Sequence, residues 1–207
     1  MTASSLRILV ADDDPLFRAG VVAMLAANPA VTVVGEAGSG TEAIEVFRAL
    51  RPDIVLVDPM RPDMDGDRVI AALRTIDPAA RIIVLTTHPG DGTARRALAA
   101  GAQGYLLKAS LTGDLASTVL GVHAGEYRIS AEVAQRLSEH RDDEALTERE
   151  LEVLRGVAAG LENKQIAKRL GLSADTVKEY VSNAMAKLHA SNRAHALSIA
   201  LARGFLR

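Results

Sequence analysis

Short apolar runs alternate with longer amphipathic segments over the first 125 residues of the chain. The apolar runs are nearly continuous, are rich in β-branched residues, and cover 6–11, 31–34, 54–57, 82–85 and 105–107. Such runs are typical of strands that are buried on both faces, as in a parallel sheet. Helix-length segments follow them at about 16–28, 40–51, 66–77, 92–100 and 111–124. The pattern predicts a doubly wound α/β domain over residues 1–125, with a five-stranded parallel sheet.

The regular pattern weakens after this domain. Residues 126–145 include the charge run EHRDDE at 139–144, and we interpret this segment as a solvated linker. Beyond it no strand pattern returns. Thr147 and Glu150 have capping-box spacing, and Ser173 and Ser191-Asn192 are further N-cap candidates. These signals predict four short helices in a small all-α domain over residues 146–207.

Composition narrows the class of protein. Hydrophobic residues make up 48% and charged residues 24% of the chain, which excludes a disordered protein. The chain has no cysteine, and this excludes disulfides, zinc fingers and thiol catalysis. No apolar stretch approaches the roughly 18 residues of a membrane-spanning helix, and Met1–Arg7 lacks a signal-peptide core. We therefore expect a cytoplasmic protein with no membrane partner.

Charge is unevenly distributed along the chain. The formal net charge is −3 over residues 1–138, −4 over 139–159 and +5 over 160–207. A basic C-terminal segment is typical of contact with an anionic partner, although an ordinary solvated surface can carry the same charge.

Polar side chains follow four of the five predicted strands. They are Asp12, Asp13, Asp14, Asp58, Thr86 and Lys108. Aspartate after a strand can simply serve a turn or a helix cap. However, ligands of open α/β sheets bind at the carboxyl ends of the strands, so these side chains are expected to share one pocket. Clustered carboxylates repel one another unless a hard cation such as Mg²⁺ intervenes. With a hydroxyl and an ammonium group beside them, they indicate phosphoryl transfer to an aspartate.

The motifs around these residues resemble those of the receiver domain of two-component response regulators. VADDDPLFR resembles the acidic-pair motif, LVDPMRPDMDG the phosphoacceptor motif, VLTTH the Thr/Ser switch and GYLLKA the lysine motif. The resemblance implies that Asp58 is the phosphoacceptor. It also implies that Asp12, Asp13, Asp58 and the Met60 carbonyl hold Mg²⁺.

The same resemblance assigns roles to three further residues. Thr86 would hydrogen-bond the phosphoryl group, Lys108 would neutralise it, and Tyr105 would be an aromatic switch that turns inward. Two residues depart from the family pattern. Pro59 follows the phosphoacceptor where an apolar residue is usual, and Arg61 precedes the loop proline where methionine is common. We interpret Arg61 as facing solvent, with attraction of phosphate as the alternative.

The C-terminal segment resembles the LuxR-type helix-turn-helix of the NarL/FixJ family across 146–207, in motifs such as LTERE and TVKEY. Helical geometry supports a DNA-facing side. At about 100° per residue from Ser173, Val177, Val181 and Ala184 share a narrow apolar face, and short polar residues lie opposite them. Such a helix suits a major groove, although a plain amphipathic surface helix is the alternative. The candidate DNA contacts are Lys164, Lys168, Arg169, Thr176, Lys178, Glu179, Ser182, Asn183 and Lys187.

Two features limit what the resemblance implies about the DNA. The family often has an apolar or hydroxyl residue where Glu179 stands, and commonly histidine at Tyr180. The sequence preference of relatives therefore cannot be carried over. The last predicted helix, with Leu197 and Leu201, resembles the dimer-forming helix of the family and could equally pack in the core.

We interpret the chain as a two-component response regulator. Its binding to double-stranded promoter DNA would be controlled by Mg²⁺-dependent phosphorylation of Asp58 from a sensor histidine kinase, with homodimer formation on phosphorylation. It would be no enzyme beyond its own phosphotransfer and slow dephosphorylation. One alternative, motivated by Pro59 and Arg61, is a receiver that regulates DNA binding without phosphorylation. A Mg²⁺-dependent aspartyl-phosphate phosphatase is disfavoured, because no cap insert is present.

Overall fold

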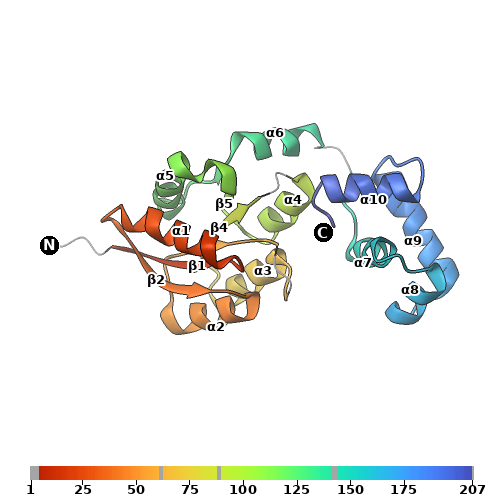
Figure 1. Cartoon of the computed structure of the whole chain (residues 1–207), viewed down its shortest axis with the longest axis horizontal. Helices are drawn as coiled ribbons and strands as arrows, with labels where there is room; N and C mark the ends of the chain where they lie inside the picture. The colour runs from red at the N-terminus through yellow and green to blue at the C-terminus, as the bar shows by residue number, and fades with distance from the viewer. Residues whose placement is uncertain (1–4, 61–62, 88–89, 141–143, 207) are drawn as a thin grey trace. The chain divides into compact units, whose positions relative to one another are not determined.

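The computed structural model describes residues 5–60, 63–87, 90–140 and 144–206. The chain divides into two compact units (Figure 1). The first comprises Met1–Pro89 with Ala94–Gln135, and the second comprises Gly90–Thr93 with Arg136–Arg207. The predicted α/β part falls in the first unit, and the predicted all-α part falls in the second.

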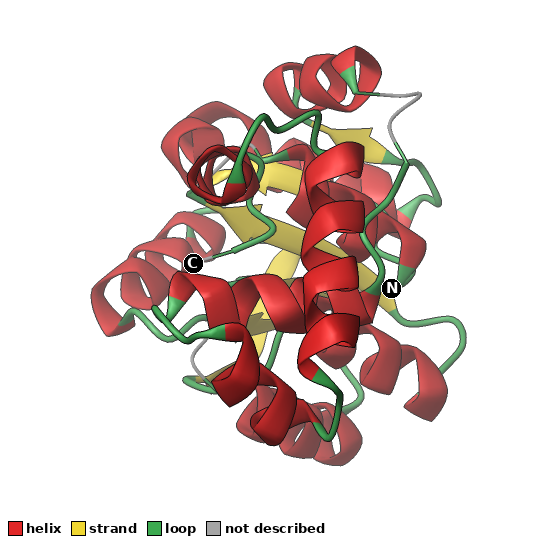
Figure 2. Cartoon of the chain, turned by 90° about the vertical axis from the view of Figure 1, so that its right-hand side faces the viewer, coloured by secondary structure: helices red, strands yellow, loops and turns green. Residues whose placement is uncertain are grey.

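A parallel sheet forms the centre of the first unit, in the order β2-β1-β3-β4-β5-β6. Its strands within the described residues are β1 (Leu6–Ala11), β2 (Val31–Ala37), β3 (Ile54–Val57), β4 (Arg81–Thr86), β5 (Gly104–Leu107) and β6 (Arg128–Ile129). Figure 2 shows the strands in yellow among the red helices. β3 and β4 are almost wholly buried, as expected of continuous apolar runs covered on both faces.

The prediction of five strands was wrong by one, because β6 adds an edge strand beside β5. Arg128 pairs with Gly104 and Ile129 with Tyr105 in parallel register. The Arg128 amide donates to the Gln103 carbonyl, and the Ser130 amide donates to the Tyr105 carbonyl, both at 2.9 Å. A two-residue strand contains no apolar run of its own, so hydrophobic periodicity could not indicate it. Helix α6 (Ala131–Glu139) follows, so much of the expected linker has regular structure.

Helices cover both faces of the sheet. They are α1 (Pro15–Ala26), α2 (Gly40–Leu50), α3 (Gly66–Ile76), α4 (Asp91–Ala99) and α5 (Leu111–His123), with a short 3₁₀ turn η1 (Lys108–Ser110). α1 and α5 lie on one face, and α2 and α3 lie on the other (Figure 1). Val21 and Leu25 of α1 pack with Leu115 and Val119 of α5 in a core that also includes residues of β1, β3 and β4.

Polar caps set where several of these helices begin. Asp14 caps α1 by accepting from the amides of Leu16 and Phe17, and Ser39 caps α2 by accepting from the Glu42 amide. Ser39 and Glu42 have capping-box spacing, but only one of the two hydrogen bonds of the box forms, from the Glu42 amide to the Ser39 hydroxyl. The Glu42 carboxylate accepts from the Gly38 amide at 2.7 Å instead.

The second unit is helical, as predicted. Its C-terminal helices are α7 (Glu148–Ala158), α8 (Asn163–Leu170), α9 (Ala174–Lys187) and α10 (Arg193–Ala202). The capping box of Thr147 and Glu150 is present, and Ser173 and Asn192 cap α9 and α10. Among the described residues, no helix combines the length and apolar character needed to cross a membrane.

Candidate functional site

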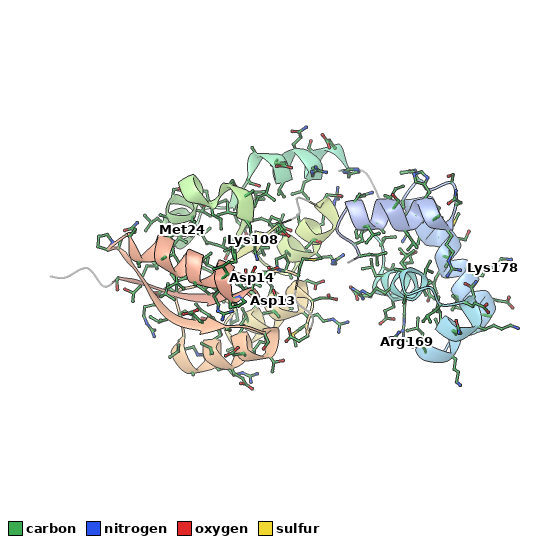
Figure 3. The ribbon with its side chains drawn as sticks, in the orientation of Figure 1. Asp13, Asp14, Met24, Lys108, Arg169 and Lys178 are labelled. Atoms are coloured by element: carbon green, nitrogen blue, oxygen red, sulfur yellow. The ribbon has the colours of Figure 1, made fainter. Side chains whose placement is uncertain are left out.

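The carboxyl ends of the central strands bring the predicted receiver residues together. Asp12 follows β1, Asp58 follows β3, Thr86 ends β4 and Lys108 follows β5. Asp12, Asp58 and Thr86 are buried, whereas Asp13 is exposed. Figure 3 shows Asp13 and Lys108 at the same end of the sheet. The parallel topology is what gathers them, because every parallel strand ends at the same edge.

Asp58 is held through both of its carboxylate oxygens. Its Oδ1 accepts from the Met60 amide, and its Oδ2 accepts from the Lys108 ammonium group, each at 2.6 Å. Burial raises the pKa of Asp58, and the neighbouring charge of Asp12 acts in the same direction, while Lys108 and the Met60 amide oppose them. The side chain is thus a desolvated carboxylate with a cation placed against it.

Lys108 bridges two carboxylates. Its Nζ also lies 2.6 Å from Asp12 Oδ2, and only 9% of its side chain is exposed. Burial lowers the pKa of Lys108, but the hydrogen bonds and charges of Asp12 and Asp58 outweigh it and hold the pKa above the ordinary value. The ammonium group therefore stays charged where a phosphoryl group on Asp58 would need a counter-charge.

Three carboxylates in this pocket are close enough to share a cation. Asp12, Asp13 and Asp58 each offer an oxygen, and these oxygens lie within 4.8 Å of one another. Oxygen ligands with several negative charges are what Mg²⁺ prefers. This acidic pocket fits a Mg²⁺ ion, with Asp12 and Asp58 buried and Asp13 open to solvent.

Thr86 and Tyr105 lie on neighbouring strands beside the pocket. Val84 pairs with Tyr105 in the β4–β5 register, and Tyr105 and Thr86 are both at most 1% exposed. Burial raises the pKa of the Tyr105 hydroxyl, so the side chain is a neutral phenol. The ring already occupies a buried position in this structure. Its role as a switch stays a prediction.

Several residues that support the pocket were missed by the sequence reasoning. Arg18 donates to the Asp12 carbonyl at 2.6 Å and pairs with Glu36 at 3.1 Å. Asp63 accepts from the amides of Gly40 and Thr41, which ties the loop after β3 to the start of α2. The residues in each of these contacts belong to different elements or lie more than twenty residues apart. Residue spacing along the sequence therefore could not predict the contacts.

The loop after Asp58 also depends on a glycine. The Gly66 amide donates to the Pro59 carbonyl at 3.1 Å, and a Cβ atom on Gly66 would lie 2.5 Å from Pro59 Cα. Such a distance is too short for any side chain, so only glycine allows this approach. Arg61, for which we predicted a solvent-facing side chain, lies outside the described residues.

In the second unit, α8 and α9 form the predicted helix-turn-helix. Gly171 has φ of +68° and ends α8, and the side chain of Ser173 caps α9 by accepting from the Thr176 amide. The predicted apolar face of α9 is buried, as Val177 and Val181 are 0% and 9% exposed. The exposed candidates for DNA contact are Lys164, Lys168, Arg169, Lys178, Glu179, Ser182 and Asn183. Figure 3 shows Arg169 on α8 and Lys178 on α9.

Two of the candidates are engaged inside the unit. The Thr176 hydroxyl lies 2.8 Å from the Ser173 hydroxyl at the start of α9. Lys187 Nζ contacts Glu150 Oε2 at 3.0 Å, Glu144 Oε1 at 3.2 Å and the Ala145 carbonyl at 3.2 Å. Burial lowers the pKa of Lys187, but its hydrogen bonds to Glu150 and Glu144 outweigh this and raise the pKa above the ordinary value.

Comparisons with known families agree with this division of the chain. Residues 8–120 match the family described as the response regulator receiver domain. Residues 144–200 match the family described as bacterial regulatory proteins of the luxR family. The two matches cover the acidic pocket and the α7–α9 region respectively.

Relatives share this architecture over almost their whole length. The nitrate/nitrite response regulator NarL of Escherichia coli K12 is 36% identical over 198 residues, which are 91% of this chain and 92% of that protein. The transcriptional regulatory protein YhcZ of Bacillus subtilis 168 is 37% identical over 205 residues, or 95% of each protein.

Solved structures give the same picture. RcsB of Salmonella enterica serovar Typhimurium, bound to the promoter rprA in the presence of the phosphomimetic BeF3⁻, has a TM-score of 0.72 and 27% identity. The match covers 95% of this chain and 98% of RcsB. The chain therefore belongs to the NarL/FixJ family of two-component response regulators, with a receiver domain followed by a LuxR-type DNA-binding domain.

Proposed function

We propose that Asp58 accepts a phosphoryl group from a phosphohistidine of a sensor histidine kinase, and that this modification controls DNA binding. The observation that carries the proposal is the setting of the Asp58 carboxylate. It is buried at the end of a central strand, contacts the Lys108 ammonium group at 2.6 Å, and shares its pocket with Asp12 and Asp13.

The reaction needs a nucleophile and charge compensation. An Asp58 carboxylate oxygen forms the new bond to phosphorus as the bond from phosphorus to the histidine nitrogen breaks, and the released imidazole takes up a proton. Lys108 would neutralise an oxygen of the transferred group, and the Thr86 hydroxyl would donate to another. Such electrostatic stabilisation is the main contribution that a protein makes to phosphoryl transfer.

The carboxylates of Asp12, Asp13 and Asp58, with the Met60 carbonyl, would hold Mg²⁺ in this pocket. A bound Mg²⁺ ion would offset the negative charge that accumulates on the phosphoryl oxygens. Hydrolysis reverses the modification: water attacks phosphorus, the bond from phosphorus to Asp58 breaks, and the carboxylate is restored. This step is the slow self-dephosphorylation that we propose for the receiver domain.

Labelling with a small phosphodonor tests the acceptor. The full chain is incubated with phosphoramidate and Mg²⁺, and the intact mass and the modified peptide are measured. Asp58→Asn should abolish labelling, because an amide is not a competent nucleophile. Asp175→Asn, which removes an exposed carboxylate on α9, should label like the wild type. Undiminished labelling of Asp58→Asn would exclude Asp58 as the acceptor.

We propose that α9 lies in the major groove of promoter DNA. Its exposed stripe of Glu179, Ser182 and Asn183 would face base edges, and Lys178 would contact phosphate at its border. The exposed cations of α8, Lys164, Lys168 and Arg169, would contact phosphates beside it. Lys187 is left out of this set, because its ammonium group binds two carboxylates and a carbonyl within the unit.

Glu179 gives the proposal a sequence-specific consequence. A carboxylate facing DNA needs a donor, and the N4 amino group of cytosine offers one without an adjacent acceptor. We expect a C·G pair opposite Glu179, worth about 1–3 kcal/mol of discrimination. Site selection should show relaxed preference at one base pair for Glu179→Ala. For Lys178→Ala it should show weaker binding to all sequences. An unchanged preferred site in Glu179→Ala would show that Glu179 reads no base.

Phosphorylation should couple the two domains through a change in assembly, which we propose is homodimer formation. DNA affinity and solution mass are measured with and without phosphoramidate plus Mg²⁺, with Asp58→Asn as the matched control. A phosphodonor-dependent rise in both quantities, absent from Asp58→Asn, supports the proposal. Equal DNA binding and equal mass in all samples would favour a receiver that acts without phosphorylation.

A further inference from the structure

The ammonium group of Lys108 has a third neighbour besides Asp12 and Asp58. Its Nζ lies 4.0 Å from the centroid of the Phe17 ring. Phe17 lies in the first turn of α1, is partly buried, and packs against the core that α1 and α5 share. A cation over the face of an aromatic ring is attracted by the ring quadrupole, and more strongly where water is excluded.

These three contacts surround the ammonium group with two carboxylates and the face of a ring. A lysine ammonium group has three donors and no acceptor. Two carboxylate oxygens lie 2.6 Å from Lys108 Nζ, and the ring leaves the group little access to water. The 9% exposure of the Lys108 side chain agrees with this arrangement. The Phe17 ring therefore lines one side of the site that holds the Lys108 ammonium group.

Hydrogen bonds from backbone amides to side-chain carboxylates connect the first turn of α1, which carries this ring, to the acidic pocket. Asp12 Oδ1 accepts from the Asp14 amide at 3.0 Å, and Asp14 Oδ1 accepts from the Phe17 amide at 3.1 Å. Asp12 Oδ2 in turn contacts Lys108 Nζ. The carboxylate of Asp12, the helix cap, the ring and the ammonium group therefore form a closed circuit of contacts.

An open cavity adjoins this circuit. It has a volume of about 320 Å³, and Phe17, Lys108, Val21, Met24 and Leu111 are among the residues that line it. A smaller side chain without a π face at position 17 would enlarge this space beside the ammonium group. The long lysine side chain could then leave the carboxylates, because its stem has apolar surface to lie against.

We propose that Phe17 is a positioning residue, which holds the Lys108 ammonium group between Asp12 and Asp58 and ready for a phosphoryl group on Asp58. This inference rests on the proposed phosphorylation of Asp58. The held ammonium group should have opposite effects on Mg²⁺ binding and on phosphorylation. A well-held ammonium group competes with a divalent cation for the oxygens of Asp12 and Asp58, and it also stabilises the transferred phosphoryl group.

Phe17→Leu keeps an apolar side chain but removes the π face. Labelling by phosphoramidate at saturating Mg²⁺ should slow about threefold to tenfold, while Mg²⁺, titrated calorimetrically, should bind a few-fold more tightly. Phe17→Tyr retains the ring and should behave like the wild type in both measurements. Leu16→Ala is the matched control, because Leu16 is the neighbouring residue on α1 and is 82% exposed.

A metal-free measurement gives an independent test. The rate at which an amine-acylating reagent modifies Lys108, measured by peptide mass spectrometry, should rise about threefold to tenfold in Phe17→Leu and stay unchanged in Phe17→Tyr. If Phe17→Leu proves unfolded by its melting curve, Phe17→Met replaces it, since methionine fills irregular apolar space better.

The outcomes separate the two proposals. An unlabelled wild type would overturn the phosphorylation of Asp58, whatever the variants do. A labelled wild type with an equally fast Phe17→Leu variant would overturn the positioning role alone. Weaker Mg²⁺ binding together with slower labelling would show that the ring acts only through packing. Failure of Phe17→Tyr to match the wild type would overturn the role of the π face.

Discussion

Replacement of Lys187 by methionine should destabilise the DNA-binding domain without removing a DNA contact. The Lys187 ammonium group lies 3.0 Å from Glu150, whose side chain is only 4% exposed, while that of Lys187 is 12% exposed. Loss of one partner of a buried ion pair leaves the other charge without compensation and costs about 3–5 kcal/mol. Glu150 keeps one hydrogen bond, from the Thr147 amide at 2.7 Å. We therefore expect about 2–3 kcal/mol, below that range.

Hydrogen exchange measures this loss where it occurs. About 2–3 kcal/mol corresponds to roughly thirtyfold to 150-fold faster exchange of the protected amides of α7 and α9. The amides of β1 and β3 in the receiver domain serve as an internal reference and should not change. Glu150→Gln combined with Lys187→Met should cost less than the sum of the two single changes, because the variants remove one shared interaction.

Lys178→Met is the matched control on the same helix. Lys178 is exposed, and the ion pairs of the described residues do not include it. Its replacement should leave exchange unchanged and lower the salt slope of DNA binding by about one unit. The reverse pattern would contradict this prediction: if Lys187→Met exchanges like the wild type and loses a unit of salt slope, Lys187 contacts phosphate.

Three further predictions concern metal, pH and backbone. Mg²⁺ should stabilise the receiver by about 2.7 kcal/mol at a hundredfold excess over Kd, and calorimetric melting of Asp13→Ala should show a smaller gain. The raised pKa of Lys187 means that its contribution is complete below about pH 10.4 and is lost as pH rises through the folded-state pKa. Urea unfolding of the DNA-binding domain should therefore show a smaller alkaline decline in Lys187→Met than in the wild type, and an equal decline in both proteins would contradict this. Gly66→Ala should cost about 1–3 kcal/mol and slow labelling, because its Cβ would meet Pro59 Cα; wild-type stability would exclude this clash.

The residues of the acidic pocket could be predicted because the hydrophobic pattern of the sequence indicates where the buried strands end. Four of the five apolar runs end next to a polar residue, and a parallel sheet brings those ends to one edge. Asp58 and Lys108 therefore meet although they are 50 residues apart. The caps at Thr147, Ser173 and Asn192 were equally readable, because a cap and its target amide are three residues apart.

The features that escaped prediction depend on how elements are rotated against one another. The contact of Phe17 with Lys108 requires a particular placement of α1 over the end of β5, and helical periodicity says only that one face is apolar. Lys187 lies at the border of the apolar face of α9, where solvent and a neighbouring helix are both possible, and its partner Glu150 is 37 residues earlier. β6 was missed because two residues are too few to form a pattern.

The caps of the C-terminal helices have a consequence for how the protein is made and how it evolves. The side chains of Thr147, Ser173 and Asn192 each accept from an amide three residues ahead, and the Gln165 side chain accepts from the Glu162 amide three residues behind it. Helix starts specified by such near neighbours favour rapid folding, whereas a parallel sheet must wait for distant segments to pair. The helices of this domain can thus begin to form from contacts within their own stretch of chain. A segment with that property is suited to be exchanged between genes, joined to a different sensor domain and still recover its shape.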